Sequence, residues 1–378
     1  MMRSAKAVHP SSVVLRALAA GVALATGACR DPADPTPRTA EIVAIGRLER
    51  GLPLLLRVVE AAGDTVPPAA VAWTVEPADA GTLRGDTLRL ERAGSIRVTA
   101  AYDGRELTRG LDVAAPPAIL FDMVVDGNRD LYRAALDGGE IERLTTHAGE
   151  DFDPTIAGDV VVFVSDRDGN DELYALPLAG GGERRLTATG VPEKHPALSP
   201  DGSRLAFVRG SGLTRLYVAN ADASQAERPD PEHGHDGTLE VAPAWSPDGR
   251  TLAFVSTAGG DPDLYLWSGG AATFLEGSDG GEFEPAWSPD GERIAFASTR
   301  DGDAELYLLR PGDRVVTRLT RREGSDGVPA WLADGRIVFV AYDGTTPSLR
   351  WLDPEAPEAV HAIALPGEAR NPTAVPPQ

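Results

Sequence analysis

One phrase recurs along the last two thirds of the chain, and it restricts the possible folds more than any other feature. It reads P-A-L-S-P-D-G-S-R-L-A-F from Pro196, P-A-W-S-P-D-G-R-T-L-A-F from Pro243 and P-A-W-S-P-D-G-E-R-I-A-F from Pro285. A looser copy, P-A-W-L-A-D-G-R-I-V-F, begins at Pro329. The copies start 42 to 47 residues apart, so each repeat unit has room for several short strands but not for a domain of its own.

Within the repeats, an apolar strand containing Phe is followed nine or ten residues later by a strand containing Leu, usually as Leu-Tyr. The Phe positions are Phe121, Phe163, Phe207, Phe254, Phe296 and Phe339. Six hairpins of nearly constant length predict an all-β fold, a six-bladed β-propeller. The first unit lacks its opening strand, and Pro372 lies on the period with no unit behind it. We therefore expect residues 371–375 to pair with residues 118–121 and close the ring.

Residues 40–115 form a different unit, before the repeats. The run Leu54–Val59 and the alternating run Val71–Val75 around Trp73 predict strands, and Ser95–Ala100 and Leu107–Val113 predict two more. Six or seven short strands in this length indicate a small β-sandwich. No cluster of titratable residues suggests catalysis there, and we expect a spacer.

The N-terminus has the pattern of a bacterial export signal. Its basic residues end at Arg16, and the apolar stretch 17–25 is too short to span a membrane as a helix. Residues 1–28 therefore form a predicted signal peptide. Small residues precede Cys29 and resemble the lipobox of bacterial lipoproteins, which implies acylation of Cys29. The alternative is a free thiol near an ordinary cleavage site. Residues 29–39 contain three prolines and predict an extended linker.

The repeat motifs P-x-W-S-P-D-G, x-I-A-F-x-S-x-R-D-G and E-L-Y resemble the TolB-type propeller repeat over residues 118–378. The order of strands in residues 40–115, V-x-W-x-V followed by A-G-x-I-x-V-T-A, is similar to bacterial Ig-like domains of the group-two type. The resemblances imply a six-bladed propeller in the cell envelope and a small Ig-like β-sandwich before it. Peptidases with related propellers carry a G-x-S-x-G nucleophile elbow, and this sequence has no such motif.

The formal charge of −21 argues against a broad nucleic-acid surface. The best positional signal for function is an acidic residue three positions before the repeat proline. It occurs in five of six units, as Asp151, Glu193, Glu240, Glu282 and Asp326. These residues precede the strand nearest the axis of a propeller, so we expect them to crowd around one mouth of its channel and bind a ligand. The alternative is that they form hydrogen bonds at blade junctions as part of the repeat.

A second candidate site lies in the longest link between repeats. His233, His235 and Asp236 could begin a metal site, although a solvated insertion explains them more simply, because such short motifs often arise by chance. No cofactor is expected apart from a possible divalent cation such as calcium.

The sequence thus favours a non-enzymatic envelope lipoprotein, held at the membrane by its lipid anchor on the periplasmic side or at the cell surface. Its channel mouth is expected to bind a protein or peptide, with a basic segment, or a cation, and no nucleic acid. The alternative is a propeller hydrolase or lyase acting on an envelope or extracellular glycan or ester. That alternative requires a histidine and carboxylates to converge in the channel, and His195, which directly precedes Pro196, is the histidine placed to do so.

Overall fold

Short alternating apolar runs separated by Gly, Pro and Asp build strands throughout the computed structural model, which describes residues 40–60, 63–233 and 237–376. The chain divides into two units between Ala115 and Pro116. The export signal, Cys29 and the proline-rich linker predicted from the sequence lie outside the described residues. A helix of the length and apolar character needed to cross a membrane does not occur in those ranges.

The first unit contains two sheets whose apolar faces share one core. One sheet has the order β1 (Ala40–Ile45), β2 (Pro53–Glu60), β5 (Thr87–Leu90), β4 (Gly81–Arg84). The other has the order β3 (Ala72–Glu76), β6 (Gly94–Tyr102), β7 (Arg105–Val113). Leu54 and Leu56 of the first sheet pack with Val98 and Leu111 of the second, and Trp73 packs against this cluster. Trp73 therefore belongs to the packing of the unit, as its alternating strand suggested.

The second unit contains six sheets of one design, which we number 1 to 6 in the order of their second strands. The first strands are β30 (Glu368–Ala374), β11 (Asp151–Ala157), β15 (Glu193–Leu198), β18 (Glu240–Trp245), β22 (Glu282–Trp287) and β26 (Asp326–Trp331). The second strands are β8 (Ala118–Val125), β12 (Val160–Ser165), β16 (Arg204–Arg209), β19 (Leu252–Ser256), β23 (Ile294–Ser298) and β27 (Ile337–Asp343).

The third strands are β9 (Asn128–Ala135), β13 (Glu172–Pro177), β17 (Arg215–Asn220), β20 (Asp263–Trp267), β24 (Glu305–Arg310) and β28 (Thr346–Asp353). The outer strands are β10 (Glu142–Arg143), β14 (Arg184–Arg185), β21 (Thr273–Glu276), β25 (Val315–Arg318) and β29 (Ala356–Ala362). Sheet 3 has three strands, and a single bridge between Val218 and Glu227 stands where its outer strand would be.

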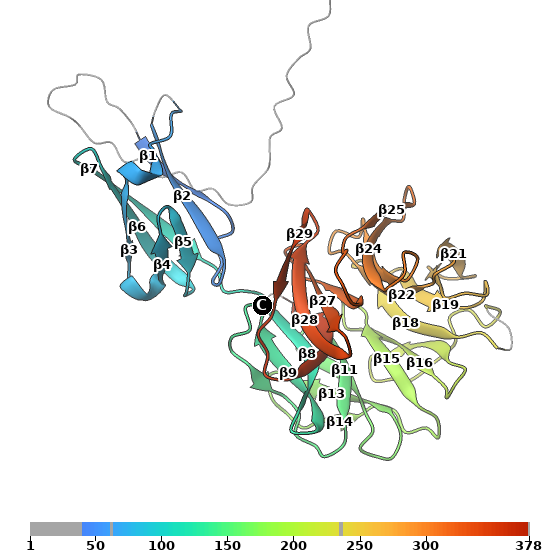
Figure 1. Ribbon diagram of the computed structural model, residues 1–378. Coiled ribbons are helices and arrows are strands. Elements are labelled where there is room, and N and C mark those ends of the chain that lie inside the picture. The colour runs from blue at the N-terminus through green and yellow to red at the C-terminus, as the bar shows by residue number, and fades with distance from the viewer. Residues whose placement is uncertain (1–39, 61–62, 234–236, 377–378) are drawn as a thin grey trace, which may run out of the picture. The chain divides into compact units, whose positions relative to one another are not determined.

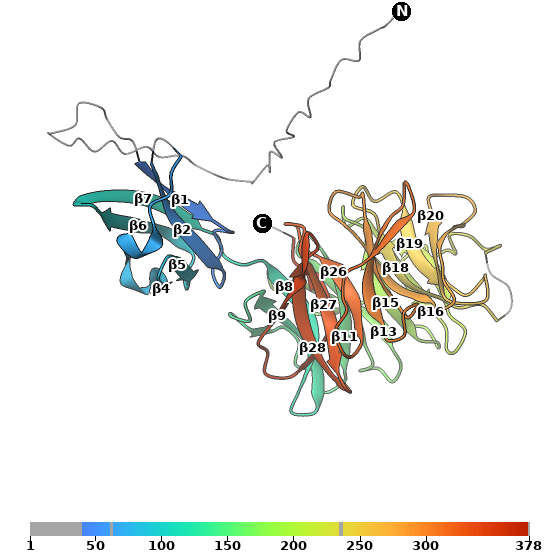
Figure 2. The same cartoon turned by 45° about the horizontal axis from the view of Figure 1, so that its top comes forward.

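The first strands form a closed ring. Each contacts the first strands of the sheets before and after it, including β30 with both β26 and β11. Strand β30 pairs antiparallel with β8, with Glu368 opposite Val124 and Ala374 opposite Ile119. The C-terminal strand thus completes sheet 1, whose other strands begin the unit, and Figures 1 and 2 show sheets 6 and 1 next to each other. Pairing the two ends of the unit removes two sheet edges at once.

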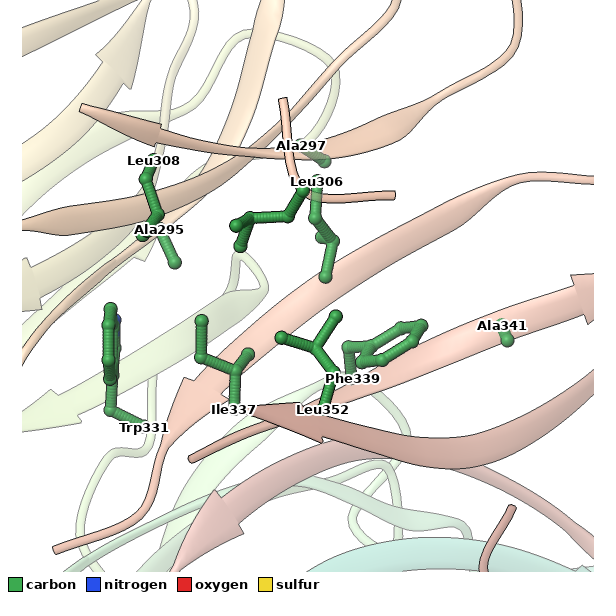
Figure 3. Packing of buried hydrophobic residues seen from close by; sticks show 10 residues of the cluster. Ala295, Ala297, Leu306, Leu308, Trp331, Ile337, Phe339, Ala341 and Leu352 are labelled. Atoms are coloured by element: carbon green, nitrogen blue, oxygen red, sulfur yellow. The ribbon is translucent and has the colours of Figure 1, made fainter. Parts of the chain in front are cut away.

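Neighbouring sheets pack face to face through the residues that recur in the repeat. Between sheets 5 and 6, Leu306 and Leu308 meet Trp331, Phe339 and Leu352, as Figure 3 shows. The Ser-Pro-Asp-Gly segments form the turns between first and second strands. In the first of them, the Ser199 hydroxyl donates to Asp201 Oδ1 at 2.6 Å. The repeat phrase therefore combines one turn with the large apolar residues that fill the space between sheets.

Candidate functional site

The five repeat carboxylates predicted to line a channel mouth are buried. Asp151, Glu193, Glu240, Glu282 and Asp326 each begin a first strand, and none is more than 2 % exposed. Each forms an ion pair with an arginine, at nitrogen–oxygen distances between 2.7 and 3.3 Å. A guanidinium largely neutralises the buried carboxylate that it binds, so that carboxylate attracts a further ligand only weakly.

In sheets 2, 3 and 5 the arginine comes from the second strand or the loop after it. The residues are Arg167, Arg209 and Arg300. Each guanidinium also lies over the Phe and Tyr rings of its own sheet, between 4.6 and 5.7 Å from the ring centroids. Arg167 and Arg300 donate through Nε to a serine, Ser165 at 2.8 Å and Ser298 at 3.1 Å. The acid, the arginine and the aromatic pair thus form one packed unit.

Sheet 4 has Ala258 where sheets 2 and 5 have this arginine, and the insertion before β18 supplies replacements. Arg228 pairs with Glu240 at 3.3 Å. The His233 ring lies against Phe254 and Tyr265, at centroid distances of 5.4 and 4.7 Å, and its Nε2 lies 3.0 Å from Ser256 Oγ. Ser256 is the counterpart of Ser165 and Ser298, so His233 fills the place of the missing guanidinium.

The remaining two sheets also keep acid and cation matched. In sheet 6, Asp343 stands at the arginine position, and Asp326 pairs instead with Arg322 at 2.9 Å. In sheet 1 the acid and the arginine are both absent, because Ala369 and Val125 occupy their positions. A carboxylate is therefore never present in this ring without a cation beside it. This pattern favours a structural role for the five acids, and the ligand-binding role predicted for them stays untested.

A second set of side chains, directly before each repeat proline, has the properties of a surface that can meet a ligand. We call it the pre-proline ring: Asp153, His195, Ala242, Glu284, Val328 and Asn371. All six are partly exposed, whereas the prolines after them are buried. All six have positive φ, between 48° and 56°, which is uncommon for residues other than glycine.

A bulge in every first strand produces this geometry. The pairing register with the second strand shifts at the pre-proline position in all six sheets, for example between Phe152 and Thr155. Proline has no N–H for a ladder hydrogen bond, and a bulge accommodates it at the cost of local strain. The strands with these bulges are the ones that form the ring, so the bulged residues gather around the ring axis.

Hydrogen bonds tie consecutive members of the pre-proline ring together. The His195 amide donates to Asp153 Oδ2 at 3.0 Å, and the Val328 amide donates to Glu284 Oε2 at 2.6 Å. The His195 Nδ1 lies 3.5 Å from the same Asp153 oxygen. Among the described residues, the other oxygen of each carboxylate, Oδ1 of Asp153 and Oε1 of Glu284, accepts no hydrogen bond. Each carboxylate therefore has one oxygen fixed by the backbone and one oxygen open to a ligand.

The charged members face one another across the ring. Burial raises the pKa of Glu284, the Val328 amide and nearby His195 lower it, and Asp153 raises it again. Glu284 belongs to sheet 5, His195 to sheet 3 and Asp153 to sheet 2, so charges from three different sheets of the ring act on one another. Around the ring, Asn371, Asp153 and His195 follow one another on sheets 1 to 3, and Glu284 on sheet 5 lies between the apolar Ala242 and Val328.

Asp122 supports this ring from the second strand of sheet 1. Its Oδ1 accepts from the Asp153 amide at 3.2 Å and from Asn371 Nδ2 at 2.9 Å, and its Oδ2 accepts from Arg129 Nε at 2.6 Å. Asp122 is fully buried, and burial raises its pKa, although Arg129 opposes that shift. Neither Asp122 nor the role of the bulge was predicted from the sequence, and His195 was the one ring member singled out there.

The predicted metal cluster is only partly described. His233 packs in sheet 4 as above, whereas His235 and Asp236 lie outside the described residues. Within residues 40–60, 63–233 and 237–376, no three His, Cys, Asp or Glu side chains are arranged to hold a metal ion. The pre-proline ring can therefore offer charges and hydrogen-bond acceptors to a ligand, but it does not form a ready-made metal cage.

Comparisons with known proteins agree with the arrangement of the sheets. The family model described as "TolB beta propeller domain" matches residues 117–229 and 236–351, more than half of the chain. TolB from Acinetobacter baumannii is a similar solved structure, with 18% identity, a TM-score of 0.62, and 84% of each chain covered. A putative TolB from Agrobacterium tumefaciens has 18% identity and a TM-score of 0.53 and covers 70% of this chain and 100% of its own.

A third similar structure is hydrazine synthase from Kuenenia stuttgartiensis, with 14% identity and a TM-score of 0.57. The match covers 69% of this chain and 47% of that one. No curated protein matches the sequence significantly. At these identities the solved structures show a shared fold and nothing more specific.

Proposed function

Since the chain belongs to the TolB beta propeller family, we propose that it is a non-enzymatic envelope lipoprotein whose propeller binds a ligand at the pre-proline ring. In this proposal Cys29 carries the lipid, residues 40–115 are an Ig-like spacer, and residues 118–378 form a six-bladed propeller. The ligand is a basic segment of a protein or peptide, or a divalent cation such as calcium. The protein then acts by holding a partner near the membrane rather than by chemistry.

One observation carries this proposal: Asp153, His195 and Glu284, from three different sheets, converge around the ring axis. Both acids are partly exposed residues, and each has a carboxylate oxygen that accepts no hydrogen bond from the described residues. A lysine ammonium or an arginine guanidinium supplies the donors that these oxygens lack. We therefore place the site two residues after the buried acids Asp151 and Glu282, which the sequence had favoured.

A titration of the mature protein with tetralysine and, separately, with Ca²⁺ tests the site. Replacing both acids, Asp153→Asn with Glu284→Gln, removes two charges but keeps an oxygen for each backbone amide. We expect affinity for at least one probe to fall tenfold or more, equivalent to about 1.4 kcal/mol, with a weaker salt dependence. The matched control replaces two acids of the Ser-Pro-Asp-Gly turns, Asp201→Asn with Asp248→Asn, and should bind as the wild type does. Equal affinities for all three proteins would contradict the proposal.

The same ring gives one reason to keep a second candidate, a hydrolase or lyase acting on a glycan or ester. His195 and Asp153 lie 3.5 Å apart, close enough for the carboxylate to orient an imidazole that moves a proton. The test is product formation from envelope and extracellular glycans and esters, with wild type and His195→Gln. Turnover that His195→Gln abolishes, in a protein that still folds, would establish the enzyme. Tetralysine binding without turnover would favour the binding protein.

A further inference from the structure

The junction between sheets 2 and 3 contains two carboxyl groups that share too few donors. Glu172 is the first residue of β13 in sheet 2, and Glu193 is the first residue of β15 in sheet 3. Both side chains are fully buried. Their buried Oε2 atoms accept no hydrogen bond from any donor in the part of the chain that the structure describes.

The other carboxylate oxygen of each glutamate, Oε1, accepts two hydrogen bonds. Glu172 Oε1 accepts from the Thr189 amide at 2.9 Å and from Asn170 Nδ2 at 3.1 Å. Glu193 Oε1 accepts from the Thr189 hydroxyl at 2.6 Å and from Arg209 Nε at 2.7 Å. Two buried oxygens without donors therefore remain at one junction. Leaving a buried acceptor unpaired destabilises the folded state, and does so more strongly when the acceptor is charged.

The charges around the pair do not remove this deficit. Arg209 faces Glu193, and Arg185 faces Glu172 at 3.2 Å but also pairs with Asp168. Asp171 and Lys194 stand beside the two glutamates and pair with each other at 2.8 Å. The nearby cations are thus shared with other acids. Because both carboxylates bind Thr189, they are close neighbours, and two ionised groups there would repel each other in the interior.

The junction between sheets 1 and 2 provides a comparison. Asp130 and Asp151 occupy the equivalent positions there and are also fully buried. Arg143, Asn128 and Thr145 donate to Asp130, and Arg167 donates to both oxygens of Asp151. The same pair of positions can therefore hold two carboxylates without an orphaned oxygen, and the junction of sheets 2 and 3 does not.

We propose that Glu172 and Glu193 form a buried proton-binding site. One proton lies between the two Oε2 atoms, where it converts two orphaned acceptors into a carboxylic acid that donates and a carboxylate that accepts. This hydrogen bond joins sheet 2 to sheet 3, and loss of the proton as the pH rises weakens that junction. The site is separate from the pre-proline ring and does not depend on the proposed function.

The surroundings assign the proton to Glu193. Burial raises the pKa of Glu193 and the neighbouring Glu172 adds to that rise, although Thr189 and Arg209 oppose it. Burial also acts to raise the pKa of Glu172, but its polar neighbours, among them Thr187, Asn170 and the Thr189 amide, outweigh burial and the pKa is lowered. Two environments that separate the pKa values of neighbouring carboxyls let one stay protonated while the other ionises.

Glu193→Gln tests the site because an amide NH₂ replaces the proton permanently while its carbonyl still accepts from Thr189 and Arg209. Unfolding of wild type and variant is followed from about pH 5 to about pH 8. A group with a raised pKa in the folded state stabilises the protein at low pH and loses that effect as the pH rises. We expect the stability of wild type to decline more steeply than that of Glu193→Gln, by about one proton in the linkage slope.

The control is Asp151→Asn at the junction of sheets 1 and 2, which should lower stability at every pH and keep the wild-type slope. Infrared spectroscopy gives a readout independent of stability: wild type should show a protonated carboxylic acid band that Glu193→Gln lacks. Equal slopes for wild type and Glu193→Gln, with no difference in that band, would overturn the proposal. Stabilisation of wild type but not of Glu193→Gln by Ca²⁺ at high pH would also overturn it, because a metal ion would then occupy the site.

Discussion

Arg167→Met should separate a structural role of the repeat carboxylates from a ligand-binding one. Arg167 contacts both oxygens of the fully buried Asp151, at 2.8 and 2.9 Å, and its own side chain is only 11% exposed. Methionine keeps most of the volume but leaves Asp151 as a buried carboxylate without a cation. Breaking a buried pair in this way costs about 3–5 kcal/mol. That is a large part of the 5–15 kcal/mol with which typical domains are stable.

Urea denaturation followed by tryptophan fluorescence measures this loss selectively. Trp73 is in the first unit and the other five tryptophans are in the second, so the signal reports mainly the unit that contains Arg167. The double variant Arg167→Met with Asp151→Leu removes both buried charges and should recover most of the stability, because the acid that still loses its partner, Glu183, is exposed to solvent.

The matched control is Arg310→Met, which breaks a pair with Asp313 at 3.1 Å. Both side chains of that pair are 55% exposed, so the change should cost at most about 0.5 kcal/mol. If Arg167→Met cost no more than this control, solvent would have to reach Asp151. The account of the five acids as packed ion pairs would then be refuted, and their predicted role at a channel mouth would become the better explanation.

Three further predictions concern other parts of the chain. His233→Ala should destabilise the protein by about 1–3 kcal/mol because its ring contacts are lost, and adding Ala258→Arg should restore stability by supplying the guanidinium that sheets 2 and 5 have. If calorimetry found no such recovery, His233 would not be the substitute for that arginine. Burial raises the pKa of Asp326 to about 6, so the free energy of unfolding should fall by up to about 3 kcal/mol as the pH rises through that value. Asp326→Asn should reduce this fall, and an unchanged slope of unfolding free energy against pH in the variant would contradict the prediction. Wild-type protein should fractionate with membranes and carry a lipid on Cys29, whereas Cys29→Ser should be released or left unprocessed. Recovery of soluble wild-type protein that begins at another residue would contradict the predicted lipid anchor.

The regular parts of the fold could be predicted from the sequence because they depend on local periodicity. The spacing of Phe163, Phe207 and their counterparts gives the hairpins, and Ser-Pro-Asp-Gly gives the turns between strands. The position of Pro372 on the repeat period predicted a closing strand, and β30 pairs with β8. The family match agrees with the propeller that these features indicated.

The site was harder to predict because sequence spacing gives a strand position but not its solvent exposure. Asp151 and Glu193 were predicted to precede the first strands and are in fact their first residues, but the arginines that pair with the five acids come from several places. Arg228 and Arg322 lie outside the repeat pattern, and only the folded chain shows that they complete it. The position before each proline had been passed over because its residues share no chemistry.

The variation in residue type at the position before each proline is the sequence signal that could have identified the ring. A side chain that nearly every unit repeats, such as the acid at Glu282, serves what the units have in common, namely their packing. A position that changes from unit to unit, as from Asp153 to His195 to Ala242, is free of that packing and is available for a specific ligand. The bulge itself could not be predicted, because a proline in a strand is compatible with several backbone conformations.

A ligand that binds at the pre-proline ring should be displaced when the ring is blocked without a change in its charge. In a Cys29→Ser background, Ala242→Cys or, as a control, Asp248→Cys is labelled with a bulky neutral maleimide, and tetralysine binding is measured before and after labelling. We expect labelling at position 242 to abolish binding and labelling at position 248, in a turn, to leave it intact. Undiminished binding to the protein labelled at position 242 would show that the ligand site lies elsewhere.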